Sequence, residues 1–271
     1  MGEHMPFALC LHTCRKGDSL PLLPATAVYE SWPCHRLEDD RTGAMVNLNC
    51  LAAGTHFVTT TPEGIALFKL TGHICLPRPQ GGHALFCPLL TALEDCSAGQ
   101  THLTVRKEGY SLAWVTLSDK GSQGLREDLS GPAIEDLASC YLPLCHCQGF
   151  LLPDEPDELR SLLTDLALHQ RYDIICTTGS TGLSPRDIAP QVTSALLDMP
   201  LPGFTQAMMA ASLAVTPHAV ISRAAAGVLG QSIVINLPGS KKAALENLRA
   251  VLPALPHALN KLHGDPADCG G

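Results

Sequence analysis

From Ser111 onward, short apolar runs alternate with longer segments in which apolar residues recur every three or four positions. The first pattern is typical of buried strands and the second of amphipathic helices. Residues 173–178 (DIICTT) and 232–237 (SIVINL) are the clearest strands, and leucines within residues 159–166 line one face of a helix. Repeated strand–loop–helix units predict a parallel sheet. We therefore expect residues 109–271 to form an α/β domain of three layers, a mostly parallel sheet with helices on both faces.

The first 108 residues have a different texture, which indicates a separate domain. Short runs rich in Thr, Val, Ile and Phe are broken by Gly and Pro, and no long helical period is present. This pattern predicts a small β-rich domain, either a barrel or a sandwich. A chain of 271 residues is long enough for two domains.

Composition and charge argue against several classes of protein. Hydrophobic residues make up 45% of the chain and charged residues 16%, so a packed core is expected. The formal charge of −8 and the lack of a Lys- and Arg-rich run argue against nucleic-acid binding. No apolar stretch reaches the ~18 residues of a membrane span, and the first residues lack the basic start of a signal peptide. The twelve cysteines include no Cys-x-x-Cys pair, so we expect reduced thiols in a cytoplasmic protein.

A glycine-rich loop (TTGSTG, residues 177–182) directly follows one of the predicted strands. Gly179 and Gly182 let the backbone turn tightly and approach a ligand, so that its N–H groups can surround an anion. Hydroxyl groups that could add to these donors belong to Thr178, Ser180 and Thr181. An ordinary glycine-rich turn is the alternative. The loop is not a Walker loop, because the Gly-Lys-Ser/Thr ending is missing.

Two aspartates lie between predicted strands and helices. Asp154 follows the strand that ends in Leu152, and Asp187 lies just before a helix that starts near Pro190. Each could simply favour the start of the next helix, as a capping residue or by opposing the helix dipole. Asp187 could instead bind Mg²⁺, because Mg²⁺ prefers one or two carboxylates together with phosphate oxygens and water.

Two further polar segments end predicted strands. Ser118 and Asp119 follow the strand at residues 112–117, where an ordinary turn is the alternative, and residues 236–241 (NLPGSK) end the last strand. Ser240 is placed to cap the next helix, whose N-terminus could hold a second phosphate. Ligands bind where the carboxyl ends of parallel strands meet, at one rim of the sheet. We therefore expect all of these segments to contribute to one ligand site.

Three groups of Cys and His residues could form sites: the first two as metal ligands, and the third as a nucleophile pair, which would need structural support. They are Cys145-His146-Cys147, Cys10-His12-Cys14 and Cys34-His35. The first places its two thiols too close together for an ordinary zinc pair, and the second has no matching half elsewhere in the chain. We interpret all three as structural side chains.

Residues 112–260 resemble the MogA/MoaB-type molybdopterin adenylyltransferases, whose fold also occurs in the G domain of gephyrin. The matching segments, in chain order, are VTLSDKG (115–121), LPDE (152–155), TTGSTGLSPRDIAPQVT (177–193), LPGF (201–204) and SRAAAGVLGQSIVINLPGSKKA (222–243). The resemblance implies a homotrimeric α/β domain that binds molybdopterin and ATP with Mg²⁺. It implies the formation of adenylyl-molybdopterin with release of pyrophosphate, and hand-over of the product to a molybdate-insertion enzyme.

The resemblance also assigns site residues. The two aspartates that the family needs for chemistry correspond to Asp154 and Asp187, and Mg²⁺ is expected at Asp187. The family's ligand-binding segments correspond to Ser118, Asp119, Thr178, Gly179, Ser180, Thr181, Gly182, Ser222, Arg223, Pro238, Gly239 and Ser240.

Two positions depart from the family pattern. The usual T-T-G-G-T-G has Ser180 at its second glycine, and the usual S-D-R has Lys120 at its end. If position 180 requires a positive φ, serine adds strain of about 1 kcal/mol. Lysine at position 120 removes the two-pronged contact that an arginine could make.

Other functions stay open at the level of sequence. The α/β domain could be a molybdopterin carrier or scaffold without turnover, or a nucleotide pyrophosphatase. Molybdate insertion fits less well, because the extra domains of the insertion enzyme are not found in these 271 residues. In the first domain, residues 51–55 (LAAGT) and 70–72 (LTG) are faintly similar to MOSC domains, and a structural appendage is the alternative.

Overall fold

The computed structural model describes residues 6–27, 33–38, 48–77 and 83–265. The chain forms two compact units, residues 1–108 and residues 109–271. In these described ranges, no helix is both long and apolar enough to cross a membrane.

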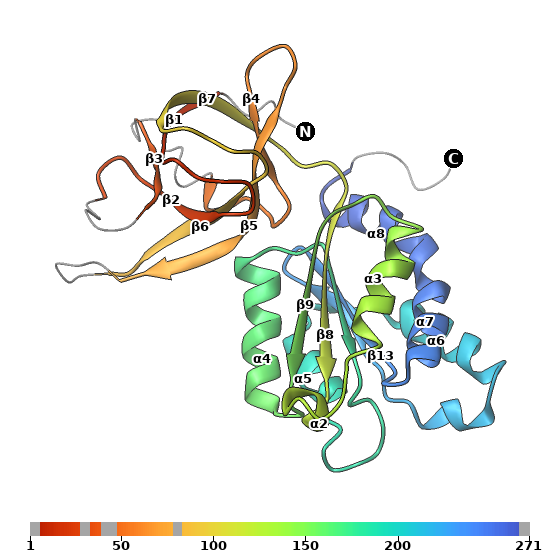
Figure 1. The fold of residues 1–271 in the computed structure, drawn as a ribbon. Helices are drawn as coiled ribbons and strands as arrows, with labels where there is room; N and C mark the ends of the chain where they lie inside the picture. Colours follow the sequence, from red (N-terminus) through yellow and green to blue (C-terminus); the bar gives the residue numbers. More distant parts are fainter. Residues whose placement is uncertain (1–5, 28–32, 39–47, 78–82, 266–271) are drawn as a thin grey trace. The chain divides into compact units, whose positions relative to one another are not determined.

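The first unit is a closed barrel of strands (Figure 1). The order around it is β1-β3-β2-β6-β5-β4-β7, and β7 pairs with β1. Among the described strands, β2 and β3 pair in parallel and the other neighbours are antiparallel. The strands are β1 (Phe7–Leu11), β2 (Ser19–Leu23), β3 (His35–Leu37), β4 (His56–Thr59), β5 (Ala66–Leu76), β6 (Leu85–Ala92) and β7 (Gly99–Arg106). Closure makes this unit a barrel and not a sandwich.

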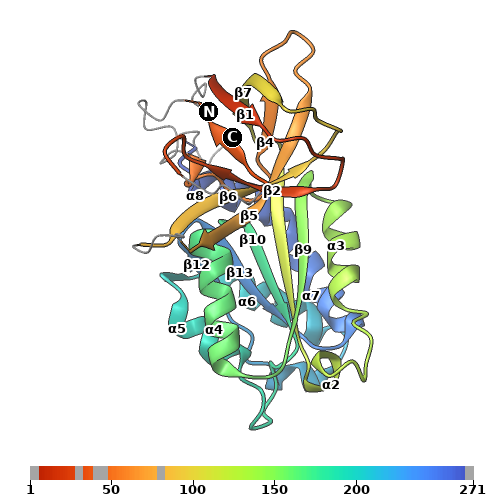
Figure 2. The same ribbon diagram turned by 60° about the vertical axis from the view of Figure 1, so that its left-hand side comes forward.

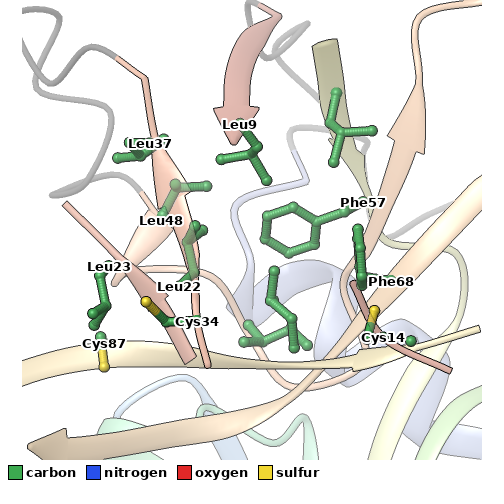
Figure 3. Packing of buried hydrophobic residues seen from close by; sticks show 14 of the residues in the cluster. Leu9, Cys14, Leu22, Leu23, Cys34, Leu37, Leu48, Phe57, Phe68 and Cys87 are labelled. Atoms are coloured by element: carbon green, nitrogen blue, oxygen red, sulfur yellow. The ribbon is translucent and has the colours of Figure 1, made fainter. Parts of the chain in front are cut away.

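Apolar side chains from several strands fill the barrel (Figure 3). Phe57 on β4 and Phe68 on β5 are fully buried, together with Leu9 and Leu22. Along most of β5, buried residues alternate with more exposed ones, because successive side chains of a strand point to opposite faces. The inward-facing set forms one packed hydrophobic core.

One histidine, His35 on β3, is enclosed in this core. Its side chain has no exposed surface, and its ring centroid lies 4.6 Å from that of Phe68. Its Nδ1 accepts a hydrogen bond from the backbone N–H of His12 at 3.3 Å, while its Nε2 has no partner in the described part of the chain. Burial lowers the pKa of His35 to about 4, because a charged imidazolium would lose its hydration.

We expect the chain to lose stability as the pH falls from 7 towards 4. Below the ordinary pKa of 6.5 the unfolded chain binds a proton at His35, whereas the folded chain stays neutral down to about pH 4. Between pH 7 and pH 5 this difference lowers the free energy of unfolding by about 2 kcal/mol. Urea unfolding of the full chain at both pH values measures it. His35→Phe should remove this part of the pH dependence and His102→Phe, at an exposed position, should keep it; equal pH dependence in both variants would contradict the prediction.

The second unit contains a six-stranded sheet with the order β11-β12-β13-β10-β8-β9. The strands are β8 (Tyr110–Leu117), β9 (Leu144–Leu152), β10 (Ile174–Thr178), β11 (Met199–Pro200), β12 (Ala226–Leu229) and β13 (Ser232–Leu237). β13, β10, β8 and β9 run parallel, whereas β12 and β11 are antiparallel to their neighbours. The α/β class is confirmed. The sheet is mixed: three of its five strand pairings are parallel, and the two at the β11–β12 edge are antiparallel. The antiparallel edge escapes sequence analysis because β11 and β12 are too short to show a period.

Helices cover both faces of this sheet (Figures 1 and 2). α3, α6 and α7 pack together on one face, and α4 and α5 contact each other on the opposite face. The helices are α2 (Asp119–Ser122), α3 (Gly131–Ser139), α4 (Pro156–Thr164), α5 (Ala189–Leu196), α6 (Pro202–Leu213), α7 (Lys241–Val251) and α8 (Leu255–Leu262). Shorter turns are the π-helical η1 (Asp165–His169) and the 3₁₀ turns η2 (Pro217–Ile221) and η3 (Leu252–Ala254).

Two glycines make room for the side chain of Trp114 on β8. A Cβ atom at Gly131, the first residue of α3, would lie 2.0 Å from the indole Nε1. A Cβ atom at Gly149 on β9 would lie 2.3 Å from the same ring. Both distances are far below van der Waals contact, so any larger residue would displace the indole.

A buried asparagine ties together the elements beneath the rim of the sheet. Nδ2 of Asn236 on β13 donates to the hydroxyls of Thr177 on β10 and Thr193 on α5, each at 2.9 Å. Oδ1 of Asn236 accepts from the N–H of Ala225 at 3.1 Å. The three side chains are fully buried, and an unpaired buried polar group costs about 1–3 kcal/mol. The network therefore fixes the strand from which the glycine-rich loop starts.

Candidate active site

A cavity of about 440 Å³ lies at the carboxyl ends of β8, β10 and β13. Figure 1 shows α2 at the same end of the sheet. The predicted site residues that line this cavity are Ser118, Thr178, Gly179, Ser180, Gly239 and Ser240. They come from three segments far apart in sequence, and the parallel strands bring them to one rim.

At Gly179 the backbone lies close to the segments that follow β8 and β13. Its φ is +99°, and a Cβ atom there would lie 2.5 Å from the carbonyl oxygen of Leu117 at the end of β8. A Cβ atom at Gly239, after β13, would lie 3.2 Å from the Cα of Gly179. The Thr178 hydroxyl donates to the carbonyl of Pro238 at 2.8 Å, which binds the same two segments. Glycine at position 179 is therefore required by backbone conformation and by space.

Ser180 also has a left-handed backbone, with φ of +57°. Its Oγ accepts a hydrogen bond from the N–H of Ile188 at 2.8 Å and donates to the carbonyl of Arg186 at 3.2 Å. These two bonds join the glycine-rich loop to the residues just before α5. The strain expected for a serine at this position is thus present, and the hydroxyl provides contacts that a glycine could not make.

Substitutions at Ser180 should separate strain from hydrogen bonding. Ser180→Gly removes about 1 kcal/mol of strain and two hydrogen bonds of about 1 kcal/mol each, so we expect a small net change in unfolding free energy. Ser180→Ala keeps the Cβ atom and loses both bonds, so it should cost about 2 kcal/mol. Urea denaturation of the two variants and the parent measures both values. Equal stability of the alanine and glycine variants would contradict the account.

Asp187 is held by its own loop and by one arginine. Its Oδ2 accepts from the N–H of Ser184 at 2.7 Å, and a Cβ atom at Gly182 would lie 2.9 Å from that oxygen. Arg223 donates to the carbonyls of Gly182 and Asp187, at 2.7 and 2.9 Å, and its N–H donates to the carbonyl of Thr181 at 3.2 Å. Arg223 therefore acts as a support of the loop in this structure.

Asp119 is engaged by two neighbouring segments. Its carboxylate accepts hydrogen bonds from the guanidinium of Arg186 and from the backbone N–H of Asp154. The hydrogen bond from Arg186 lowers the pKa of Asp119 below its usual value. Asp154 is half-buried after the end of β9. In the described structure, neither Asp154 nor Asp187 lines the 440 Å³ cavity.

Asp128 is a cavity-lining residue that sequence analysis missed. Its Oδ2 accepts from the hydroxyl of Thr116 at 2.6 Å, and its Oδ1 accepts from the N–H groups of Ser130 and Gly131 at 3.0 Å. Asp128 thereby satisfies the N-terminus of α3, where Ser130 makes no side-chain cap bond. Its contacts with Ser130 and Gly131 are local, whereas its contact with Thr116 forms only when β8 is in place, so the sequence does not mark Asp128 as a cavity residue.

Two cations line the cavity in a chain whose formal charge is −8. They are Arg126, before α3, and Lys241, the first residue of α7. Lys241 falls within the LPGSKKA segment of the family resemblance, whereas Arg126 lies in no matching segment. Together with the N-terminus of α7, which Ser240 caps, they make this rim suited to anions.

Ser222 and Arg223 lie at a different cavity, of about 480 Å³, which α6, η2 and α7 border. Met208 and Asn247 also line it. The predicted residues are therefore split between two cavities of the α/β unit. Arg223 nevertheless contacts the glycine-rich loop, because its guanidinium donates a hydrogen bond to the carbonyl of Gly182.

One of the Cys and His groups noted in the sequence, Cys145-His146-Cys147, lies near the start of β9. On β9, the Nε2 of buried His146 lies 3.1 Å from the hydroxyl of Tyr172. In the described parts of the chain, no cluster of three or more His, Cys, Asp or Glu residues is arranged to hold a metal ion.

A sheet rim, a glycine-rich loop and a capped helix N-terminus occur together in a class of α/β domains that bind phosphate-bearing ligands. The second unit is a domain of this class. The chain belongs to the molybdopterin-binding family, because the family model described as "Probable molybdopterin binding domain" matches residues 113–257. These residues lie within the α/β unit.

Named relatives and solved structures are similar to the same part of the chain. Gephyrin of Dictyostelium discoideum is 37% identical over 171 residues, which cover 59% of this chain and 24% of gephyrin. The molybdopterin adenylyltransferase of Helicobacter pylori strain 26695 is 39% identical over 153 residues, covering 56% of this chain and 86% of that protein. The crystal structure of the molybdopterin biosynthesis enzyme MoaB from Thermus thermophilus has 41% identity and a TM-score of 0.54, covering 59% of this chain and 99% of that one.

Proposed function

We propose that the α/β unit transfers AMP from ATP to the phosphate of molybdopterin and releases pyrophosphate. The observation that carries the proposal is the rim cavity, where backbone of the glycine-rich loop meets two cations and the N-terminus of α7 in a molybdopterin-binding domain. Relatives named molybdopterin adenylyltransferase, 31–39% identical, support this reaction. The bacterial relatives among them are covered over 72–86% of their length.

The reaction forms a bond between a molybdopterin phosphate oxygen and the α-phosphorus of ATP. The bond from that phosphorus to the bridging oxygen breaks, and pyrophosphate leaves with the electron pair. Such transfers need positioning and charge neutralisation more than covalent help from the protein. Arg126, Lys241 and the amides at the start of α7 are the groups we assign to the phosphate oxygens. Asp154 would orient the attacking phosphate or share the metal ion.

The donor set near Asp187 fits Mg²⁺. Carboxylate oxygens are hard ligands, and Mg²⁺ needs only one or two of them besides phosphate and water. The absence of a Cβ atom at Gly182 leaves the Asp187 carboxylate close to the loop backbone, which keeps it fixed. When bound, Mg²⁺ would neutralise part of the charge of the triphosphate. Asp187 would hold it, and Asp154 is the second candidate ligand.

An assay with three mixtures tests the function. The full chain is incubated with ATP and Mg²⁺, with molybdopterin and Mg²⁺, and with all three. We expect pyrophosphate only in the complete mixture, in equal amount to adenylyl-molybdopterin. Pyrophosphate without molybdopterin would identify a nucleotide pyrophosphatase. Molybdopterin binding without pyrophosphate would identify a carrier, and either result would overturn the proposal.

We also propose a homotrimer that passes its product to a molybdate-inserting enzyme. Exposed apolar side chains gather at the end of α6 and on η2: Leu213, Val215, Val220 and Ile221. Grouped apolar residues of this kind are typical of contact surfaces between subunits. Light scattering coupled to size-exclusion chromatography tests the assembly, and the mass of a single chain at working concentration would contradict it.

A further inference from the structure

Arg186 connects three segments of the α/β unit. Its Nε and Nη2 donate to the two carboxylate oxygens of Asp119, at 3.1 and 2.7 Å. Its Nη1 donates to Oε1 of Glu155 at 2.8 Å. These partners follow β8 and β9, whereas Arg186 belongs to the loop that follows β10. Figure 1 shows α2, which begins at Asp119, beside the start of α4 at this end of the sheet.

The same carboxylate also holds the chain at Asp154. Oδ1 of Asp119 accepts from the backbone N–H of Asp154 at 3.1 Å and from Nη2 of Arg186. Asp154 immediately precedes Glu155, and Arg186 immediately precedes Asp187. One carboxylate therefore links the backbone of the first expected catalytic aspartate to the neighbour of the second.

The contact needs arginine and not merely a positive charge. Two parallel N–H donors match the two oxygens of Asp119, and the third donor group is left for Glu155. A lysine could not make this fork. The side chains are about half exposed, at 51% for Arg186 and 40% for Asp119. Exposed ion pairs add little to global stability. The contact can still fix the relative positions of the segments that it joins.

The segment at Arg186 and Asp187 is also held through its backbone carbonyls. Arg223 binds the carbonyl of Asp187, and Ser180 binds the carbonyl of Arg186. These contacts fix the loop to itself and to the segment before β12. Arg186 adds the side-chain contacts that join the loop to the segments after β8 and β9.

We propose that the Asp119–Arg186 pair is a positioning device that sets the spacing between Asp154 and Asp187. Neither side chain needs to contact the substrates for this role. The inference rests on the proposed AMP transfer, in which both aspartates act on the same pair of phosphates. It departs from the expectation that Asp119 is a substrate ligand, because both of its oxygens are bonded within the protein.

A double-mutant cycle on the full chain tests the role. Arg186→Gln and Asp119→Asn should each lower kcat about 10- to 100-fold, because misplacement of about 1 Å at a reacting group has effects of this size. KM for ATP should change by less than about threefold, since no substrate contact is lost. The double variant should be no worse than either single variant. Arg186→Lys should remain impaired, because it restores charge without the fork.

Independent losses that multiply in the double variant would show that Asp119 acts on the substrate directly, and would overturn the proposal. Full activity of Arg186→Lys would overturn it as well. Arg160→Gln is the matched control, because Arg160 bonds Asp157 within α4 and should leave kcat unchanged.

Hydrogen exchange separates this inference from the proposed function. In the absence of substrates, the backbone N–H groups of Asp154 and Glu155 and those within residues 180–188 should exchange faster in Arg186→Gln than in the parent and in Arg160→Gln. Unchanged exchange in Arg186→Gln would contradict the positioning role, whatever the turnover of that variant. Lack of turnover by the parent chain, together with faster exchange in Arg186→Gln, would contradict only the proposed AMP transfer.

Discussion

Asp187→Asn should reduce pyrophosphate release about 100- to 1,000-fold, with the fold intact. Asparagine has the same shape, and its Oδ1 can still accept the hydrogen bond that Ser184 donates to Asp187. The loop should therefore keep its conformation while the charge that Mg²⁺ requires is lost. Asp154→Asn should produce a loss of similar size, because the loss of one charge-stabilising group commonly has an effect of this order.

The measurement is initial-rate pyrophosphate release at saturating ATP and molybdopterin, repeated over a series of Mg²⁺ concentrations. The loss in Asp187→Asn should be partly recovered at high Mg²⁺. Asp157→Asn is the control, since Asp157 lies three residues beyond Asp154 on α4 and its side chain is 95% exposed. Unchanged turnover in both the Asp187 and Asp154 variants would remove their assigned roles.

Gly179→Ala should abolish measurable transfer and destabilise the unit. The added methyl group would lie 2.5 Å from the carbonyl oxygen of Leu117, and φ of +99° is unfavourable for alanine. The oxygen belongs to the backbone of β8, so relief requires the strand end and the loop to separate. We expect a loss of about 3 kcal/mol in unfolding free energy and at least a 100-fold loss in kcat/KM, since about 1 Å of displacement has that effect.

Gly124→Ala separates the two causes. Gly124 has φ of +72°, yet a Cβ atom there would meet nothing within 4 Å. It should cost about 1 kcal/mol through backbone strain alone, with turnover preserved. Urea denaturation and steady-state kinetics on both variants make the comparison. Similar behaviour of the two would mean that the contact with Leu117 is unimportant.

The sequence revealed those elements whose pattern is local. β10 and β13 have continuous apolar stretches and α4 carries a leucine stripe, so each is recognisable without its neighbours. The glycine-rich loop could be predicted for the same reason. The positive φ of Gly179, directly after β10, is a local property that favours glycine. The six cavity-lining residues that were predicted all belong to such segments.

Features that depend on distant partners stayed hidden. The pair of Arg186 and Asp119 spans 67 positions, and nothing in either segment announces the other. Asp128 looks like an ordinary loop carboxylate until β8 brings Thr116 to it. The closed barrel of the first unit depends on the pairing of β1 with β7, the first and last strands of that unit in sequence order. Pattern analysis gives the strands of such a unit but not their neighbours.

The close fit around Trp114 gives the molecule its own optical probe. The chain has two tryptophans, and this one has its indole nitrogen against Gly131, whose N–H is bonded to Asp128 at the wall of the rim cavity. Indole emission responds to local polarity and hydrogen bonding. A ligand that reorders the start of α3 would therefore change the fluorescence spectrum without any attached dye.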